Sequence, residues 1–470
     1  MENTKDYNRK IQINIDIIMI FISIIGLFVC LINITSLPES SYSIILLPAI
    51  YIICLIILVC SKRRKKIHII SSFLMVFYSV QYLFFPLYIC CSGTMNLNGY
   101  NIELKEHIAD AVLLQSLVLI CVTFYLMLSK KNNNICVSNN LIKKIENSKK
   151  SKRFIFILVF IAIVVLVVYP QFKLKFRFIF YSNNENYYSF LDASKTVRGS
   201  MPIYVYVLGL WFLQITKLLL IYYLIIFLWN LSKGKDESIY IILSAIVIGI
   251  SCMITTEDKA ATIFSAISII LLMLKLYPKK ARNIVFFLGG LLFTFILIGF
   301  FIIPMNKPNG SMIVAYKLNA YFSGTINVAG GFLMDTSNRL TTFFGDILRS
   351  IPLINHYFTN LPMSYIEFNR ALGYDIKYNS QIIPIISQGY YYFGIIGAIL
   401  YPITLICIAK RFYNKMITST FTFEFYKNAM LFVFSFLGLF LYDLALTFAQ
   451  ILNYCLPMCI IYFITKKGRK

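Results

Sequence analysis

IYIILSAIVIGISCMITTEDKAATIFSAISIILLMLKL (Ile239–Leu276) contains two apolar runs separated by three consecutive charged residues, Glu257, Asp258 and Lys259. Each run approaches the roughly 20 apolar residues that a helix needs to cross a bilayer. The charges leave almost no room for a loop between the runs. This stretch therefore predicts two membrane-spanning helices joined by a tight, charged turn.

The rest of the chain has the same apolar character. Of its 470 residues, 59% are hydrophobic and 14% are charged, whereas a soluble domain carries about 25% charged residues. The short segments of alternating polarity that build a transmembrane barrel are not found in the sequence. We therefore expect an all-α, polytopic integral membrane protein, with residues 1–470 forming a single transmembrane domain.

Segment length and hydropathy predict about twelve membrane spans. They cover residues 11–32, 42–60, 68–91, 110–128, 154–170, 203–229, 239–255, 260–276, 284–304, 381–408, 428–446 and 450–465. The last two runs have almost no polar loop between them, so they can alternatively form one re-entrant element.

The net charge of +24 comes largely from short basic patches beside these spans. The patches are SKRRKK at 61–66, KKIENSKKSKR at 143–153, YPKKAR at 277–282 and KKGRK at 466–470. Cytoplasmic loops of membrane proteins are enriched in Lys and Arg in this way, which favours membrane topology over nucleic-acid binding as the origin of the charge. We predict a multi-pass protein of the cytoplasmic (inner) membrane with both termini in the cytoplasm.

Two predicted outer loops are long, residues 171–202 and residues 305–380. Loops of more than about 15 residues are usually functional or disordered, and the aromatic, periodic sequence of the second loop favours order. Within it, RLTTFFGDILRSI (Arg339–Ile351) has apolar and polar faces, which predicts an amphipathic helix. This helix can lie flat on the outer bilayer surface, or pack on the protein with Asp346 and Arg349 as an ordinary ion pair.

The second loop is rich in cations on the side of the membrane where cations are normally depleted. Lipid-linked phosphates suit such a surface, because Arg binds phosphate through paired, charge-assisted hydrogen bonds. The alternative is that the cations only balance nearby acidic residues. Eleven cysteines and three histidines show no spacing typical of a metal site or a disulfide framework, so we expect neither metal nor cofactor.

SCMITTEDKAATIF places Lys259 at a small, polar turn between two central spans, and the long loop 305–380 follows later in the chain. Directly after that loop, Asn379 precedes SQGYYYFGIIGAILYP, in which aromatic residues, Phe393 and Gly394 lead into the next span. These features resemble the O-antigen polymerase (Wzy) family and cover roughly residues 170–410.

Further positions show both agreement with this family and departure from it. Arg198 and Gly209 have the Arg-x10-Gly spacing that some members carry. Lys259 stands where Arg is more usual, which removes the paired hydrogen-bonding geometry. Gln388 stands where an acidic residue is common.

The resemblance implies a glycosyltransferase that acts at the outer face of the inner membrane. A polyprenyl-pyrophosphate-linked glycan would donate its chain to the non-reducing end of a second lipid-linked repeat unit, and polyprenyl pyrophosphate would leave. Neither a sugar nucleotide nor a metal ion is expected. Expected partners are the lipid-linked oligosaccharides, the membrane lipid, a flippase and a chain-length regulator.

Such a transfer needs fixed cations for the leaving pyrophosphate and a base for the attacking hydroxyl. The candidates for pyrophosphate binding are Lys259, Arg198, Arg339, Arg349 and Arg370. The candidates for the catalytic base are Glu367, Asp346, Glu257 and His356. The candidates for sugar binding, in stretches that mix aromatic and polar residues, are Asn379, Gln388 and Tyr374.

Alternatives exist at the level of residues and of function. Glu367 and Arg370 can be an ordinary helical ion pair, and His356 can be structural. Glu257 and Asp258 favour the start of the following helix, so only Lys259 needs another explanation: it either neutralises them or binds pyrophosphate. The competing functions are a lipid-linked oligosaccharide flippase or other transporter, an O-antigen ligase-type transferase, and a non-enzymatic assembly protein.

Overall fold

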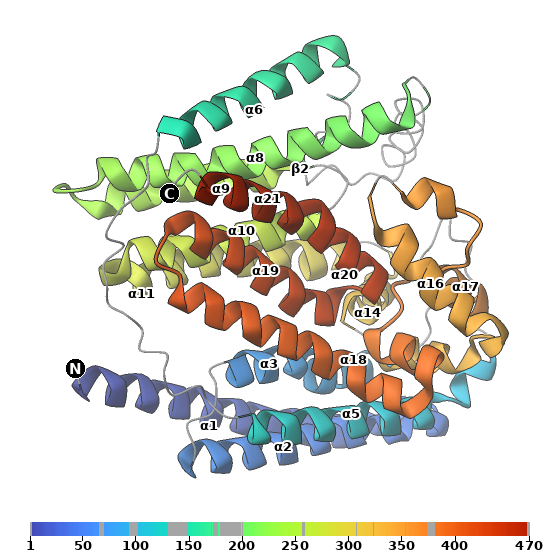
Figure 1. Cartoon of the computed structure of the whole chain (residues 1–470). Helices are drawn as coiled ribbons and strands as arrows, with labels where there is room; N and C mark the ends of the chain where they lie inside the picture. The colour runs from blue at the N-terminus through green and yellow to red at the C-terminus, as the bar shows by residue number, and fades with distance from the viewer. Residues whose placement is uncertain are drawn as a thin grey trace.

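The computed structural model describes residues 2–64, 70–93, 102–129, 149–170, 172, 177–178, 199, 201–255, 259–306, 308–322, 324–352, 354–373 and 381–467. Within these residues the chain is almost entirely helical, and its long helices are apolar (Figure 1). The protein is therefore an all-α, membrane-embedded protein, as its composition predicts.

The helices follow one another along the chain with few long interruptions. The first part contains α1 (Glu2–Asn33), α2 (Leu46–Arg64), α3 (Ile70–Ser79), α4 (Phe85–Ser92), α5 (Ile108–Leu128) and α6 (Lys149–Val168). The middle contains α8 (Ile203–Leu231), α9 (Glu237–Met253), α10 (Lys259–Leu276), α11 (Ala281–Ile284), α12 (Gly290–Leu297) and α13 (Ile303–Met305). The last part contains α14 (Gly310–Tyr321), α15 (Thr325–Gly330), α16 (Arg339–Ser350), α17 (Ser364–Ala371), α18 (Ile385–Thr418), α19 (Thr422–Leu441), α20 (Leu444–Gln450) and α21 (Leu456–Lys467).

Short elements complete this order. Strand β1 (Arg177–Phe178) pairs antiparallel with β2 (Ile254–Thr255), so the segment after α9 lies beside part of the first long loop. In the part of the chain that the structure describes, single π-helical turns join consecutive helices at four places, which are η3 (Val80–Phe84), η7 (Val285–Gly289), η8 (Ile298–Ile302) and η12 (Ile451–Cys455).

Eight helices of the described chain are long and apolar enough to cross a membrane. They are Ile17–Ser36, Glu39–Ser61, Phe73–Ser92, Ile108–Leu128, Ile203–Leu231, Ile385–Thr418, Thr422–Leu441 and Leu444–Ile464. A bent pair, Ala261–Leu276 and Pro278–Gly289, raises the number to nine if it counts as one broken span; its two parts meet at 108°. The predicted fold class is confirmed, whereas the predicted count of about twelve spans is not confirmed.

The predicted spans that differ from the observed helices lie mainly in the middle of the chain. The apolar helices Phe156–Val168 and Glu237–Cys252 are shorter than a full span. The predicted spans 260–276 and 284–304 belong to the bent pair and to the π-interrupted helices that follow it. At the end of the chain, α19 and α20 are separated only by Tyr442 and Asp443, and the helices on both sides are long enough to cross separately.

Helix α19 lies at the centre of the bundle. Its apolar residues cover all sides and most of them are buried, which is typical of a helix enclosed by other helices. It packs against α18 and α10, and Phe434 contacts Phe264 of α10 edge-on with ring centroids 5.2 Å apart. Figure 1 shows α1, α2 and α5 on one side of this centre and α8 and α6 on the other.

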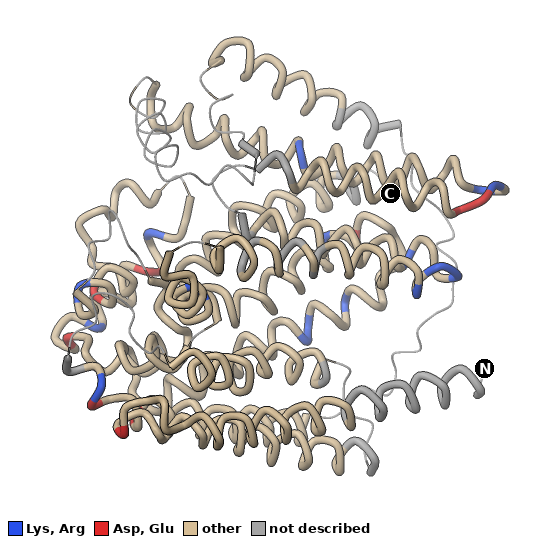
Figure 2. The backbone as a smooth tube through the Cα atoms, turned by 180° about the vertical axis from the view of Figure 1, so that it is seen from behind, with Lys and Arg blue, Asp and Glu red and all other residues tan. Residues whose placement is uncertain are grey.

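The two ends of the bundle differ in chemistry. The start of α1, the end of α21 and α11 lie at one end (left in Figure 1), close to where α18 ends. Basic residues gather in this region, as Figure 2 shows, with Lys279, Lys280 and Arg282 around the start of α11 and Lys415 in the last turn of α18. Helices α14, α16 and α17 lie at the opposite end, where Figure 2 shows acidic and basic residues together.

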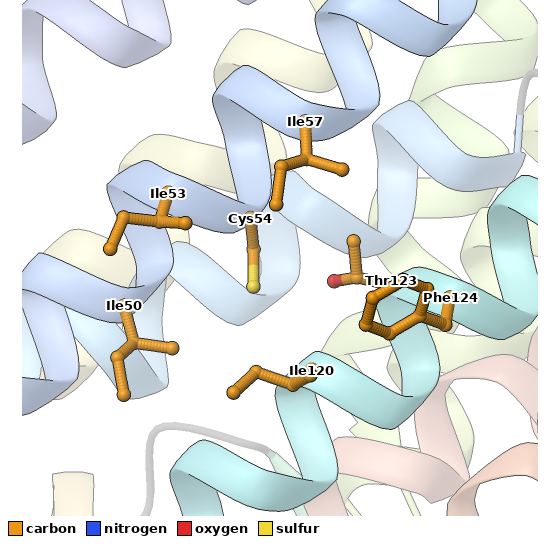
Figure 3. A pocket seen from close by; sticks show the side chains of 7 residues that line it. All are labelled: Ile50, Ile53, Cys54, Ile57, Ile120, Thr123 and Phe124. Atoms are coloured by element: carbon orange, nitrogen blue, oxygen red, sulfur yellow. The ribbon is translucent and has the colours of Figure 1, made fainter.

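A hollow between α2 and α5 is lined by apolar side chains (Figure 3). Two of its lining groups are polar: the Thr123 hydroxyl donates to the Leu119 carbonyl at 2.8 Å within its own helix, and the Cys54 thiol interacts with Thr123. Ile53 and Phe124 on its rim are each 54% exposed, so the hollow opens toward the outside of the bundle. It offers a polar substrate only this hydroxyl and this thiol, both already engaged, and we place the candidate site elsewhere.

Candidate active site beneath the helical cap

We call residues 310–373, which contain α14 to α17, the cap. The cap is fastened to the bundle through polar contacts. The Tyr88 hydroxyl of α4 donates to the Ser311 carbonyl at the start of α14 (2.9 Å).

Within the cap, α16 approaches the segment before α17 closely. At Gly345, an added Cβ would lie 2.0 Å from the Pro362 carbonyl oxygen, so this approach requires glycine.

Four buried amide side chains connect the cap to the segment before α18. Asn319 donates to the Asn327 side chain at 3.1 Å, and Asn327 donates to the side chain of Gln381 at 2.8 Å. Asn369 donates to the Gln381 carbonyl at 2.8 Å and accepts from the Gln381 backbone N–H at 2.6 Å. Because buried amides are costly without partners, this network fixes α14, α15 and α17 relative to the start of α18.

The Asp346 carboxylate lies at the centre of a second buried network. Ser364 donates to it from its backbone N–H (3.0 Å) and from its hydroxyl (2.5 Å), and Gln388 donates through Nε2 at 2.9 Å. The Tyr392 hydroxyl donates as well. Asp346 is 1% exposed. One side chain of α16 thus ties together α16, the start of α17 and the start of α18.

Asp443 lies on the other side of Gln388. Its Oδ1 accepts from the Leu446 backbone N–H at 2.7 Å and so caps the start of α20. Gln388 Oε1 accepts from the Leu444 backbone N–H at 2.7 Å, so Gln388 bridges the Asp346 network and the α20 start. The Asp443 Oδ2 atom is buried and has no hydrogen-bond partner among the described residues.

Burial and mutual repulsion set the protonation of these two acids. Burial, and then the charge of Asp346, raise the pKa of Asp443 from 3.8 to about 7. Burial also raises the pKa of Asp346, against the opposing effect of its hydrogen bonds from Ser364, Tyr392 and Gln388. Two carboxyl groups that interact in this way titrate as a pair, so the cluster can retain a proton near neutral pH.

Tyr365 and Arg349 border the two acids. Burial raises the pKa of Tyr365, Arg349 opposes this rise, and the charges of Asp443 and Asp346 add to it. These three charged groups therefore lie within electrostatic reach of the Tyr365 hydroxyl. Arg349 is half-buried and its guanidinium donates to the Leu361 carbonyl at 2.8 Å, so its main contact here is a backbone oxygen of the cap.

The structure brings several predicted site residues into one region of the cap. Asp346 and Gln388 are in direct contact. Glu367 and Arg370 form the i,i+3 ion pair on α17 at 2.9 Å, with side chains 20% and 71% exposed. Arg339 begins α16 and is exposed. Arg370 is therefore open to solvent and Glu367 partly so, whereas Asp346 is enclosed.

His356 lies apart from the buried cluster, on the short helix η11 (Asn355–Phe358). It is exposed, and its ring contacts that of Tyr357 with centroids 3.9 Å apart. Among the described residues, no other candidate site residue contacts it. Its role as a base stays a prediction.

Other predicted positions lie outside the described residues. These are Arg198, Glu257, Tyr374 and Asn379. Lys259 is the first residue of α10 and follows closely on β2, which is paired with β1 from the loop 171–202. Ile254 and Thr255, which precede the charged residues of the opening sequence, thus pair with part of the first long loop.

Sequence reasoning missed Ser364 and Tyr392 as partners of Asp346, and Asp443 as a member of the cluster. For Ser364 and Tyr392 no local pattern marks the role. For Asp443 a signal existed, because it is the only charged residue between Lys427 and Lys466. An isolated charge in so apolar a stretch is usually functional or buried among polar partners.

Comparisons with known proteins identify no relative of this chain. Among protein-family models, curated proteins and solved structures, nothing matches the chain. Its function must therefore be argued from the residues and their geometry.

Proposed function

We propose that this chain is a metal-independent glycosyltransferase. It would polymerise polyprenyl-pyrophosphate-linked oligosaccharide repeat units into a surface polysaccharide, an O-antigen or a capsule. One observation carries the proposal beyond the sequence resemblance. The cap is anchored through buried polar groups, and it exposes Arg339, Arg370 and apolar side chains of α16. A lipid pyrophosphate needs both, cations for its phosphates and apolar contacts for its chain.

The proposed orientation places the cap at the outer face of the cytoplasmic membrane. The start of α1 and the end of α21 lie at the end of the bundle around which Lys279, Lys280 and Arg282 are found. Under the positive-inside rule, that end is cytoplasmic. The cap then faces outward, which is the side where lipid-linked repeat units are polymerised in the family that this sequence resembles.

The accessible residues of the cap take the direct roles in this proposal. Arg370 and Arg339 bind the donor pyrophosphate, since both guanidinium groups are exposed. Glu367 is the base, because it is partly exposed and already lies beside Arg370. Asp346 is a positioning residue, since its acceptor sites are occupied by Ser364, Gln388 and Tyr392.

The reaction balances without a metal or a sugar nucleotide. An acceptor hydroxyl attacks the anomeric carbon of the donor glycan and forms the new glycosidic bond. The bond between that carbon and the pyrophosphate oxygen breaks, and the electron pair leaves with the polyprenyl pyrophosphate. The hydroxyl proton passes to Glu367, and the arginines stabilise the charge that develops on the leaving group.

Deletion of the gene, followed by gel analysis of the surface glycan, separates the candidate functions. The polymerase proposal predicts surface glycan that carries single repeat units only. Persistence of long chains would show the proposal to be wrong. Loss of all surface glycan would instead favour a flippase, and full-length chains that stay on the carrier lipid would favour a ligase-type transferase.

A reconstitution tests the chemistry directly. Lipid-linked repeat units extracted from the deletion strain are mixed with the purified full-length protein in detergent, without added metal or sugar nucleotide. We expect a ladder of longer lipid-linked products and release of polyprenyl pyrophosphate. The matched control is the Arg370→Ala variant at equal concentration, for which we expect a weaker ladder.

A further inference from the structure

A surface helix in water normally turns its polar side outward and buries its apolar side. Helix α16 does the opposite. It buries Thr342, Gly345, Asp346 and Ser350. It leaves Leu340 61% exposed and Phe344 56% exposed. Apolar surface left in water forgoes about 25 cal/mol for every Å² that could be buried. The outward side of α16 therefore favours an apolar neighbour.

A break in α18 extends this surface. Phe393 (φ −133°) and Gly394 (φ 64°) leave the helical conformation, and the first part of α18 folds back on the rest. An added Cβ on Gly389 would lie 2.4 Å from the Gly397 carbonyl oxygen, which shows how closely the two parts approach. The positive φ at Gly394 is readily adopted only by glycine. The turn leaves Phe393 48% exposed.

Aromatic contacts join the two helices. The rings of Phe343 and Phe393 lie 5.6 Å apart between centroids, and those of Phe343 and Phe344 lie 5.5 Å apart. The apolar surface of α16 is therefore continuous with that of the turn in α18.

The same surface continues along α18 itself. Ile395, Ile396 and Leu400 are 54%, 69% and 52% exposed. They lie on a helix that is long and apolar enough to cross the membrane, and such exposed apolar side chains on a spanning helix face lipid. The surface of α16 is thus an extension of a surface that the bilayer covers.

The charged groups of α16 do not interrupt this surface. Asp346 is enclosed, and Arg349 turns toward the Leu361 carbonyl. Arg339 is exposed at the first residue of the helix. From that position its guanidinium can reach the lipid phosphates while its aliphatic part stays in the apolar region.

We infer that α16 and the Phe393–Gly394 turn form a lipid-docking surface whose partner is the acyl chains of the adjacent leaflet. The outward side of α16 lies among these chains, and its polar side holds the cap to the bundle. The Asp346 cluster therefore sits immediately behind a membrane-facing wall. This inference does not rest on the proposed enzymatic function.

Tryptophan fluorescence in vesicles tests this placement. The chain has two tryptophans, Trp211 and Trp229, both on α8, so one further Trp adds a measurable signal to that of the parent. We would prepare full-length Leu340→Trp and Phe344→Trp variants, and Thr336→Trp as the matched control at an exposed polar position of the cap. Each is placed in phosphatidylcholine vesicles with or without bromine on the acyl chains, and iodide is the aqueous quencher.

The added emission of Leu340→Trp and Phe344→Trp should be strongly quenched by brominated chains and hardly by iodide, and that of Thr336→Trp should show the reverse. Quenching of both α16 variants by iodide alone would place the helix in water and overturn the inference. Resistance to both quenchers would overturn it in favour of a contact with a second protein surface. The substituted positions are exposed, so both variants should fold, and a single symmetric size-exclusion peak checks this.

Discussion

Helices α19 and α16 are held in place by opposite kinds of contact. Helix α19 is enclosed by other helices and buries apolar side chains on all sides. Helix α16 buries its polar side against α17 and α18 and turns apolar side chains outward. Close packing of apolar side chains dominates at the centre of the bundle, while a small set of directional hydrogen bonds to one buried carboxylate holds the cap. The two regions should therefore respond differently to substitution.

The largest effect should come from Asp346→Ala. The change removes the acceptor of the Ser364 hydroxyl, the Gln388 amide and the Tyr392 hydroxyl. Each of these three buried groups left without its partner costs about 1–3 kcal/mol, so the summed cost reaches about 3–9 kcal/mol. We expect the cap to detach, with new cleavage within residues 336–373 under limited proteolysis, mapped by mass spectrometry.

Asp335→Ala is the matched control for this experiment. Asp335 is another aspartate of the cap, but it is exposed and binds only Ser337 in the described structure. Its substitution should leave the cleavage pattern unchanged. If Asp346→Ala also leaves the pattern unchanged, hydrogen bonding to Asp346 does not hold the cap, and the comparison of the two helices fails.

Phe434→Ala tests the other side of the comparison. Phe434 is 1% exposed and contacts Phe264 and Tyr454. Truncation of a buried Phe to Ala costs about 3–5 kcal/mol. We expect a lower temperature of unfolding for the whole protein, measured by intrinsic fluorescence in detergent, without selective cleavage of the cap. Phe448→Ala, at a 45% exposed position, is the control and should change this temperature far less.

A smaller effect should appear as a dependence of stability on pH. The Asp443 pKa is about 7 in the folded protein and about 3.8 when unfolded. Between these values the folded state binds the extra proton, so the free energy of unfolding should fall as pH rises from about 4 to about 7 and then level off. The raised pKa of Asp346 contributes a change of the same sign.

Asp443→Asn separates the contribution of this residue. Asn keeps an oxygen that can cap the Leu446 N–H, but it does not titrate. The slope of unfolding temperature against pH should become shallower in this variant, and its stability above about pH 7 should match or exceed that of the parent. An unchanged slope would show that Asp443 does not titrate in this range.

Sequence reasoning succeeded where structure is local. Most spans follow from the length and hydropathy of single segments, and the predicted helix Arg339–Ile351 is α16, Arg339–Ser350. It could not show which way α16 faces. The partners of the Asp346 side chain lie 18, 42 and 46 residues away in the chain, so no periodicity within the helix reveals them. The predicted twelve spans counted α6 and α9 as complete, although their described apolar parts are short.

The smallest effect on stability should come from the ion pair of Glu367 and Arg370, because exposed pairs contribute about 0.2–1 kcal/mol. Arg370→Ala should therefore leave the unfolding temperature nearly unchanged and the cap resistant to proteolysis. If Arg370 binds the donor pyrophosphate, the same variant should nevertheless shorten the product ladder in reconstitution. Lys substitution should restore the ladder only in part, since it keeps the charge and loses the paired hydrogen bonds.

Glu367→Gln breaks the same ion pair but leaves the arginine in place. It therefore separates the effect of losing the ion pair from the effect of losing the cation. As the proposed base, Glu367 should govern turnover with saturating donor, whereas Arg370 should govern the donor concentration needed for half-maximal rate. A Glu367→Gln variant that elongates chains at the parent rate would remove Glu367 from the reaction. An Arg370→Ala variant with unchanged donor dependence would show that Arg370 does not bind the pyrophosphate.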